Sequence, residues 1–99
     1  MADTTIEVLI QALNNYLTVH GKRIISFLKL TNQQKVMIEI RALYRYFTPS
    51  IKYTRLEDVI KELIAKNVTE IGDTEIILKT KNSNAYLEVP ISYIENVIK

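Results

Sequence analysis

The chain lacks cysteine and tryptophan, and its 99 residues include one histidine, two glycines and two prolines. The absence of cysteine excludes disulfides, thiolate nucleophiles and cysteine-based zinc or iron–sulfur sites. Two separate glycines cannot build a Walker phosphate loop or a dinucleotide-binding turn, because both motifs need several. The apolar runs are short, and the first twenty residues do not have the pattern of a signal peptide. We therefore expect a cytoplasmic protein that does not enter a membrane.

Few side chains are suited to catalysis. His20 is the only imidazole, and it precedes Gly21 at the predicted end of a helix, where the helix dipole favours a cationic ring. We interpret it as structural. The acidic residues Glu70, Asp73 and Glu75 lack the spacing of an EF-hand, and a solvated turn explains them. The sequence therefore predicts no enzyme activity, no metal, no cofactor and no small-molecule substrate.

The residues that are present are typical of a folded globular protein. Hydrophobic residues make up 47% of the chain and charged residues 24%. Isoleucine, leucine and valine together supply 32 of the 99 residues, so we expect an aliphatic core on regular elements. A chain of this length predicts a single domain over residues 1–99.

Four pairs of Thr or Ser with Glu or Gln three residues later predict helix starts. The helices predicted from them cover residues 4–20, 31–47, 54–66 and 91–98. Gly21 is expected to end the first helix and Pro49 to follow the second. In the third helix, Ile64 belongs to the apolar face. Residues 22–30 fit a strand or a short helix, and their length favours a strand.

Alternating polarity predicts a β-hairpin over residues 74–81 and 84–89, with Asn82 and Ser83 as its loop. This loop places Thr80 opposite Ala85 and Leu78 opposite Leu87 on an apolar face. The other face is left for solvent or a partner. The predicted fold class is α+β, with three to four helices packed on a small antiparallel sheet that includes this hairpin in the C-terminal half.

Charge is unevenly distributed along the chain. Residues 22–55 contain eight bases and one acid, a net charge of +7, whereas residues 1–21 sum to −2 and residues 56–99 to −3. This asymmetry indicates an anionic partner or self-association between complementary surfaces.

The predicted helix over 31–47 has two apolar stripes. The broad stripe, which includes Tyr44, is expected to enter the core. A narrower stripe at i, i+4 and i+8 consists of Ile38, Ala42 and Tyr46. We predict that this second stripe forms the interface of a homodimer. The alternative is that residues 22–30 cover it within one chain.

A different hypothesis is nucleic-acid binding by the basic middle segment and the hairpin. Six bases would contact DNA phosphates: Arg41, Arg45, Lys52, Arg55, Lys79 and Lys81. Tyr46 and Tyr53 would supply stacking or hydroxyl contacts. Interleaved arginine and tyrosine are equally typical of protein interfaces, so the sequence leaves both functions open.

The predicted order of elements, with a possible strand between the first two helices and a hairpin after the third, resembles the winged helix-turn-helix family. This resemblance implies a transcriptional regulator whose third helix reads the major groove with Arg55, Lys61 and Lys66. The hairpin would contact the DNA through Lys79, Lys81, Asn82 and Asn84. Three features depart from the family: the long connection over residues 48–53, the long second helix over 31–47, and a third helix whose exposed bases and acids cancel.

The composition, rich in isoleucine, lysine and tyrosine and free of cysteine, resembles small uncharacterised proteins of archaeal filamentous and rod-shaped viruses. This resemblance implies a thermostable accessory protein, frequently dimeric, in the host cytoplasm. Taken together, the sequence predicts a non-catalytic binding module that forms a homodimer, with winged-helix-like DNA binding as the alternative.

Overall fold

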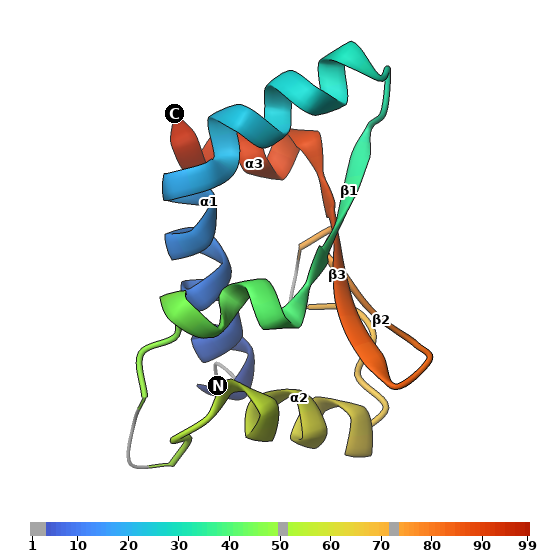
Figure 1. Ribbon diagram of the computed structural model, residues 1–99. Coiled ribbons are helices and arrows are strands. Elements are labelled where there is room, and N and C mark those ends of the chain that lie inside the picture. The colour runs from blue at the N-terminus through green and yellow to red at the C-terminus, as the bar shows by residue number, and fades with distance from the viewer. Residues whose placement is uncertain (1–3, 50–51, 72–73) are drawn as a thin grey trace.

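The computed structural model describes residues 4–49, 52–71 and 74–99 (Figure 1). These residues form three α-helices, one 3-10 helix and three strands. In chain order they are α1 (Thr4–Leu30), β1 (Lys35–Glu39), η1 (Ile40–Tyr46, the 3-10 helix), α2 (Leu56–Ala65), β2 (Ile77–Lys81), β3 (Asn84–Pro90) and α3 (Ile91–Ile98). The helices pack with a small antiparallel sheet, so the predicted α+β class is confirmed.

The three strands form a sheet in the order β1-β3-β2, and both pairings are antiparallel. The hairpin of β2 and β3 has the predicted register, with Thr80 opposite Ala85 and Leu78 opposite Leu87. Its two loop residues, Asn82 and Ser83, have φ angles of 51° and 69°. Positive φ at both positions is the geometry of the tight turn that matches the twist of a hairpin.

α1 does not end at Gly21, as the sequence predicted, but continues to Leu30 as one helix of 27 residues. The predicted strand over 22–30 is therefore wrong. Gly21 lies where α3 packs against α1, and a Cβ placed there would come within 2.6 Å of Ile98 Cγ2 and 3.3 Å of Ile94 Cγ2. The absence of a side chain thus serves close helix packing. Asn32, with a φ of 56°, follows the actual end of the helix.

The predicted helix over 31–47 is also wrong, because its first half is β1 and its second half is η1. Thr31 does not begin a helix: its hydroxyl donates to the carbonyl oxygen of Phe27 in the last turn of α1, at 2.9 Å. The branched side chains Val36 and Ile38 instead lie opposite Val89 and Leu87 of β3. Pairing with a strand fifty residues later overrides the local helical pattern.

The remaining helices lie close to their predicted ranges. α2 begins after Arg55 and α3 after Pro90, and neither of these residues caps its helix with a side-chain hydrogen bond, so the predicted capping boxes do not form there. Asn67, with a φ of 58°, follows α2, and the Val68 N–H donates to the Leu63 carbonyl at 2.9 Å. This is the hydrogen bond of a Schellman ending, made here by asparagine rather than glycine.

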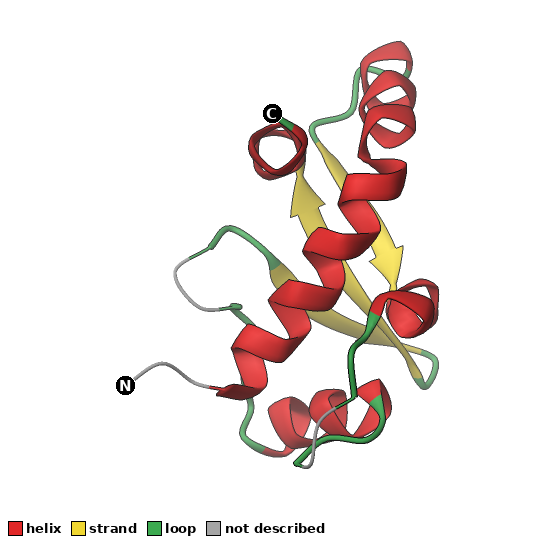
Figure 2. Cartoon of the chain, turned by 90° about the vertical axis from the view of Figure 1, so that its left-hand side faces the viewer, coloured by secondary structure: helices red, strands yellow, loops and turns green. Residues whose placement is uncertain are grey.

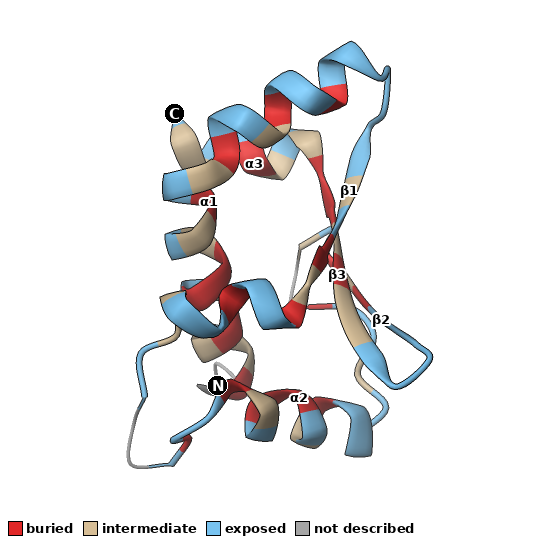
Figure 3. Cartoon of the chain, viewed as in Figure 1, coloured by how far each residue is buried: buried red, intermediate tan, exposed pale blue. Residues whose placement is uncertain are grey.

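The core lies between α1 and one face of the sheet, which α1 crosses in Figure 2. The buried residues include stretches of α1 and of β3, the central strand of the sheet (Figure 3). Leu9, Leu13 and Leu17 of α1 are fully buried, as is Leu87 at the centre of the sheet. Within the described ranges, no helix combines the length and the apolar character needed to cross a membrane.

Candidate binding cleft

The three residues predicted to form a dimer interface do not share a surface. Ile38 is a core residue of β1 with 3% of its surface exposed, whereas Ala42 is exposed on η1. Tyr46 is half-buried, and its hydroxyl lies 2.8 Å from His20 Nε2 of α1. The predicted stripe required one continuous helix, and a strand followed by a 3-10 helix separates its members. These three residues therefore do not form the single apolar stripe on which the predicted dimer interface depended.

The six predicted DNA contacts are all exposed, but they lie on different elements. Arg41 and Arg45 belong to η1, Lys52 and Arg55 to the segment before α2, and Lys79 and Lys81 to β2. They differ in their electrostatic partners. Among the described residues, Arg45, Lys52 and Lys81 have no ion-pair partner.

The other three bases are held by carboxylates. Arg41 lies 3.7 Å from Glu39, Arg55 lies 2.8 Å from Glu57 and Lys79 lies 2.6 Å from Glu88. Exposed pairs of this kind contribute little to stability, but each places a negative charge beside the base. These three bases are therefore less available to phosphate than the sequence suggested.

Tyr53, predicted as a stacking residue, is 4% exposed and belongs to a buried polar cluster. Its hydroxyl donates to Glu62 Oε2 of α2 and lies 2.5 Å from Thr5 Oγ1 of α1. The hydrogen bonds from Tyr53 and Lys66 lower the pKa of Glu62 below its ordinary value. This cluster fixes the chain before α2 against α1, and Tyr53 is not available to a nucleic-acid base.

A concave surface lies where η1, α2 and the tip of the β2–β3 hairpin meet, a region near the lower part of Figure 1. It is a cleft of about 390 Å³. Ile40 of η1 and Ile60 of α2 line it and are buried. Tyr44 and Ile64 also line it, yet they remain 42% and 46% exposed. The cleft thus combines an apolar base with two large side chains that the described part of this chain covers only in part.

Four charged residues line the same cleft: Glu39, Arg41, Glu57 and Lys61. Their two negative and two positive charges cancel. The Tyr44 hydroxyl donates to Glu57 Oε1 at 3.2 Å. Partial burial and the bond to this carboxylate raise the pKa of Tyr44 above its ordinary value. The charged groups provide a polar boundary with no excess of one sign.

The cleft offers contact surface rather than reactive groups. In the part of the chain that the structure describes, every buried side-chain nitrogen and oxygen has a hydrogen-bond partner. No three His, Asp or Glu side chains of that part are grouped to hold a metal, and Asp73 of the acidic segment lies outside it. His20 lies on α1 among the rings of Tyr16 and Tyr46, away from the residues that line the cleft.

Sequence reasoning missed this site because it assigned Tyr44 and Ile64 to apolar faces that enter the core. Both assignments follow helical periodicity, which cannot distinguish an apolar side chain that finds a partner from one that does not. Three residues that the sequence singled out as nucleic-acid contacts do line the cleft: Arg41, Lys61 and Asn84.

Comparison with known proteins gives no match to a family model, to a curated protein or to a solved structure.

Proposed function

We propose that this protein is a non-catalytic binding module, and that the cleft between η1, α2 and the hairpin receives apolar side chains of a partner protein. The observation that carries the proposal is the exposure of Tyr44 and Ile64 beside the buried Ile40 and Ile60. Fully burying one large apolar side chain contributes roughly 1.5–3 kcal/mol. Because 42% of Tyr44 and 46% of Ile64 are still exposed, a partner that covers them gains somewhat less than half of this free energy at each residue.

The charge around the cleft favours a protein over a nucleic acid. Glu39 and Glu57 would repel phosphates as strongly as Arg41 and Lys61 attract them. An apolar centre with a polar boundary, including tyrosine and arginine, is instead the composition of protein interfaces. The mixed boundary also suits a peptide that carries charges of both signs next to its apolar residues.

The size of the cleft indicates how much of a partner enters it. A volume of 390 Å³ lies near the lower end of the range of about 300–1,000 Å³ found for ligand sites. A short segment that presents one or two large apolar side chains fills such a space. The occupant is therefore a peptide segment rather than a whole folded surface.

The test is selection of short random peptides, displayed on phage, against the purified full chain. Selected peptides are then synthesised and their affinities measured for wild type, Ile64→Ser and Val19→Ser. Val19 is the matched control, since it is 63% exposed on α1 and does not line the cleft. We expect peptides with paired apolar residues, and a loss of about tenfold or more with Ile64→Ser only.

Two results would reject this function. One is that selection yields no peptide that binds in the micromolar range. The other is that the selected peptides bind Ile64→Ser as well as wild type, or lose equal affinity with Val19→Ser. Circular dichroism of both variants establishes that they retain the fold.

Duplex DNA binding is the second candidate. The order helix, strand, short 3-10 helix, helix and hairpin is compatible with a winged helix-turn-helix domain, although the strand and the short helix do not lie at the residues predicted for them. Arg45, Lys52 and Lys81, which form no ion pair with a described residue, are the bases best able to bind phosphate. Against this, Glu57 and Asp58 occupy the first turn of α2, the helix that the resemblance places in the major groove.

Fluorescence anisotropy with a short duplex tests this candidate. DNA binding by the predicted bases requires an affinity that falls steeply between low and moderate salt, and that falls further with Arg45→Glu or Lys81→Glu. Glu95→Lys, an exposed charge change on α3, is the control. Salt-independent binding, or binding that both base variants leave unchanged, would eliminate it.

A further inference from the structure

β1 and β2 are the two edge strands of the sheet, and they differ in how their outer edges are occupied. The outer edge of β2 is covered by the segment before it: Glu70 forms a bridge with Ile77, and the Leu78 N–H donates to the Thr69 carbonyl at 2.7 Å. β1 pairs with β3 on one side, and no other described segment pairs with it. β1 is therefore an open edge, the kind of strand to which another strand can add.

The hydrogen-bond pattern shows which groups of β1 point outward. The Ile91 N–H donates to the Gln34 carbonyl at 2.8 Å, so the pair one position before Lys35 and Pro90 is hydrogen-bonded. In an antiparallel ladder such pairs alternate with pairs that exchange no bonds. Pro90, which has no N–H, stands opposite Lys35 in agreement with this alternation.

Because of this alternation, the N–H and C=O groups of Val36 and Ile38 form hydrogen bonds with β3. The backbone groups of Lys35, Met37 and Glu39 then point away from the sheet. Of these, the Glu39 carbonyl belongs to the start of η1, which Glu39 precedes. Both groups of Lys35, both groups of Met37 and the N–H of Glu39 remain for a further strand.

We infer that the further strand is β1 of a second copy of this chain, paired antiparallel about a two-fold axis at Met37. In this register each Met37 lies opposite its symmetry mate, and Lys35 lies opposite Glu39 of the other copy. The two Met37 residues exchange two hydrogen bonds, and each Glu39 N–H donates to a Lys35 carbonyl. This register uses every outward group of β1 except the N–H of Lys35.

Charge complementarity selects a second copy over an unrelated strand. The sequence Lys-Val-Met-Ile-Glu is complementary to itself when reversed, because its ends carry opposite charges. Two lysine–glutamate pairs result, on the face of the sheet opposite α1, and cross-strand pairs of this kind are favourable. On that face Met37 is 47% exposed, so its pairing also buries apolar surface.

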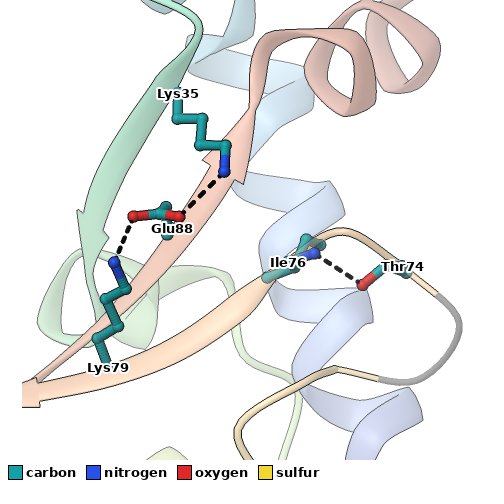
Figure 4. A network of polar contacts seen from close by, with 5 residues as sticks. All are labelled: Lys35, Thr74, Ile76, Lys79 and Glu88. Atoms are coloured by element: carbon teal, nitrogen blue, oxygen red, sulfur yellow. Dashed lines mark hydrogen bonds and ion pairs between the residues drawn. The ribbon is translucent and has the colours of Figure 1, made fainter.

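The contacts that these side chains make within one chain are compatible with the dimer. Figure 4 shows Lys35 of β1 and Lys79 of β2 on either side of Glu88 of β3. Lys35 lies 3.4 Å from Glu88, whereas Lys79 lies 2.6 Å from it. Glu88 thus keeps its closer partner when Lys35 also contacts Glu39 of the second copy. The contact of Glu39 with Arg41, at 3.7 Å, is longer still, so Glu39 can also contact Lys35 of the second copy.

Reversing the charge at Lys35 or at Glu39 tests the proposed strand pairing. Lys35→Glu places two acids at each end of the strand pair, and Glu39→Lys places two bases there. Each variant alone should dimerise at least about tenfold more weakly than wild type. An equimolar mixture of the two variants restores both lysine–glutamate pairs, so it should form a heterodimer with an affinity within about threefold of wild type. Lys22→Glu, an exposed change on α1, is the control and should leave the dimer intact.

Sedimentation equilibrium measures these affinities. For wild type we expect a mass that rises from 11.5 kDa toward twice that value with increasing concentration. A mass of 11.5 kDa at every concentration up to about 1 mM would overturn the inference without any variant. A wild-type dimer that Lys35→Glu leaves intact, or single variants that do not associate on mixing although circular dichroism shows both folded, would also overturn it.

Discussion

The glycine inside α1 gives the sharpest prediction about stability. Alanine is better than glycine in a helix interior by about 1 kcal/mol, so Gly21→Ala would stabilise an uncrowded helix. Here the new methyl group would lie 2.6 Å from Ile98 Cγ2, whereas carbon atoms pack at about 3.5–4.0 Å. Ile98 must therefore move by roughly 1 Å. Its branched Cβ resists rotation, and the fully buried Ile94, at 3.3 Å, limits the space.

Overpacking of this kind typically costs 1–3 kcal/mol, which exceeds the helix-propensity gain. We expect Gly21→Ala to destabilise the chain by about 1 kcal/mol net, which corresponds to a fall in Tm of about 4–8 °C. Urea unfolding followed by circular dichroism measures this change. Ile98→Ala removes the crowding atom, so in that background Gly21→Ala should instead stabilise by up to about 1 kcal/mol.

The comparison of Gly21→Ala in the wild-type and Ile98→Ala backgrounds tests whether the contact with Ile98 explains the glycine. If Gly21→Ala stabilises the wild-type chain, or has the same effect in both backgrounds, the contact with Ile98 does not explain the glycine. The reasoning that α1 runs past Gly21 because α3 needs close approach would then be refuted.

Four further predictions concern the turns and the partly buried polar cluster of Thr5, Tyr53 and Glu62. Ser83→Gly should stabilise by about 0.5–1 kcal/mol, because glycine adopts the φ of 69° without strain, and a lower urea midpoint would contradict the turn geometry. Asn67→Gly should act in the same direction at the end of α2, measured in the same way. Tyr53→Phe should raise the pKa of Glu62 toward its ordinary value of 4.5 in a carboxyl NMR titration, and an unchanged pKa would show that the hydroxyl does not donate to it. Because the folded-state pKa lies below 4.5, Glu62 stabilises the fold above that pH and loses this effect as the pH falls below it, so Glu62→Gln should flatten the acid limb of the stability curve.

The hairpin could be predicted from the sequence because its information is local. Alternating side chains and a two-residue loop fix which residues lie opposite each other, and the observed pairs Thr80–Ala85 and Leu78–Leu87 follow directly. The general α+β class was predictable for the same reason, since most helices carry their own periodic pattern.

The N-terminal half could not be predicted because distant contacts decide it. Gly21 has the local character of a helix end, yet its reason is the packing of α3, more than seventy residues later. Val36 and Ile40 have helical spacing, yet Val36 lies in a strand because it pairs with Val89 of β3. In both places a tertiary contact outweighs a local preference.

The cleft illustrates the same limit for function. Tyr44 and Ile64 belong to apolar patterns that normally enter a core, and only the arrangement of η1, α2 and the hairpin leaves them exposed. The basic residues were visible in the sequence, but not all of their partners were. Glu57 is only two residues from Arg55, whereas Glu88, which neutralises Lys79, comes from the neighbouring strand β3.

Methyl NMR of the protein mixed with a peptide selected for binding tests the proposed cleft most directly. If the peptide occupies the cleft, the methyl signals of Ile40, Ile60 and Ile64 shift on titration, and those of Val19 and Leu30 on α1 do not. Shifts confined to the α1 methyl groups, with Ile60 and Ile64 unchanged, would contradict the assignment of this cleft as the binding surface.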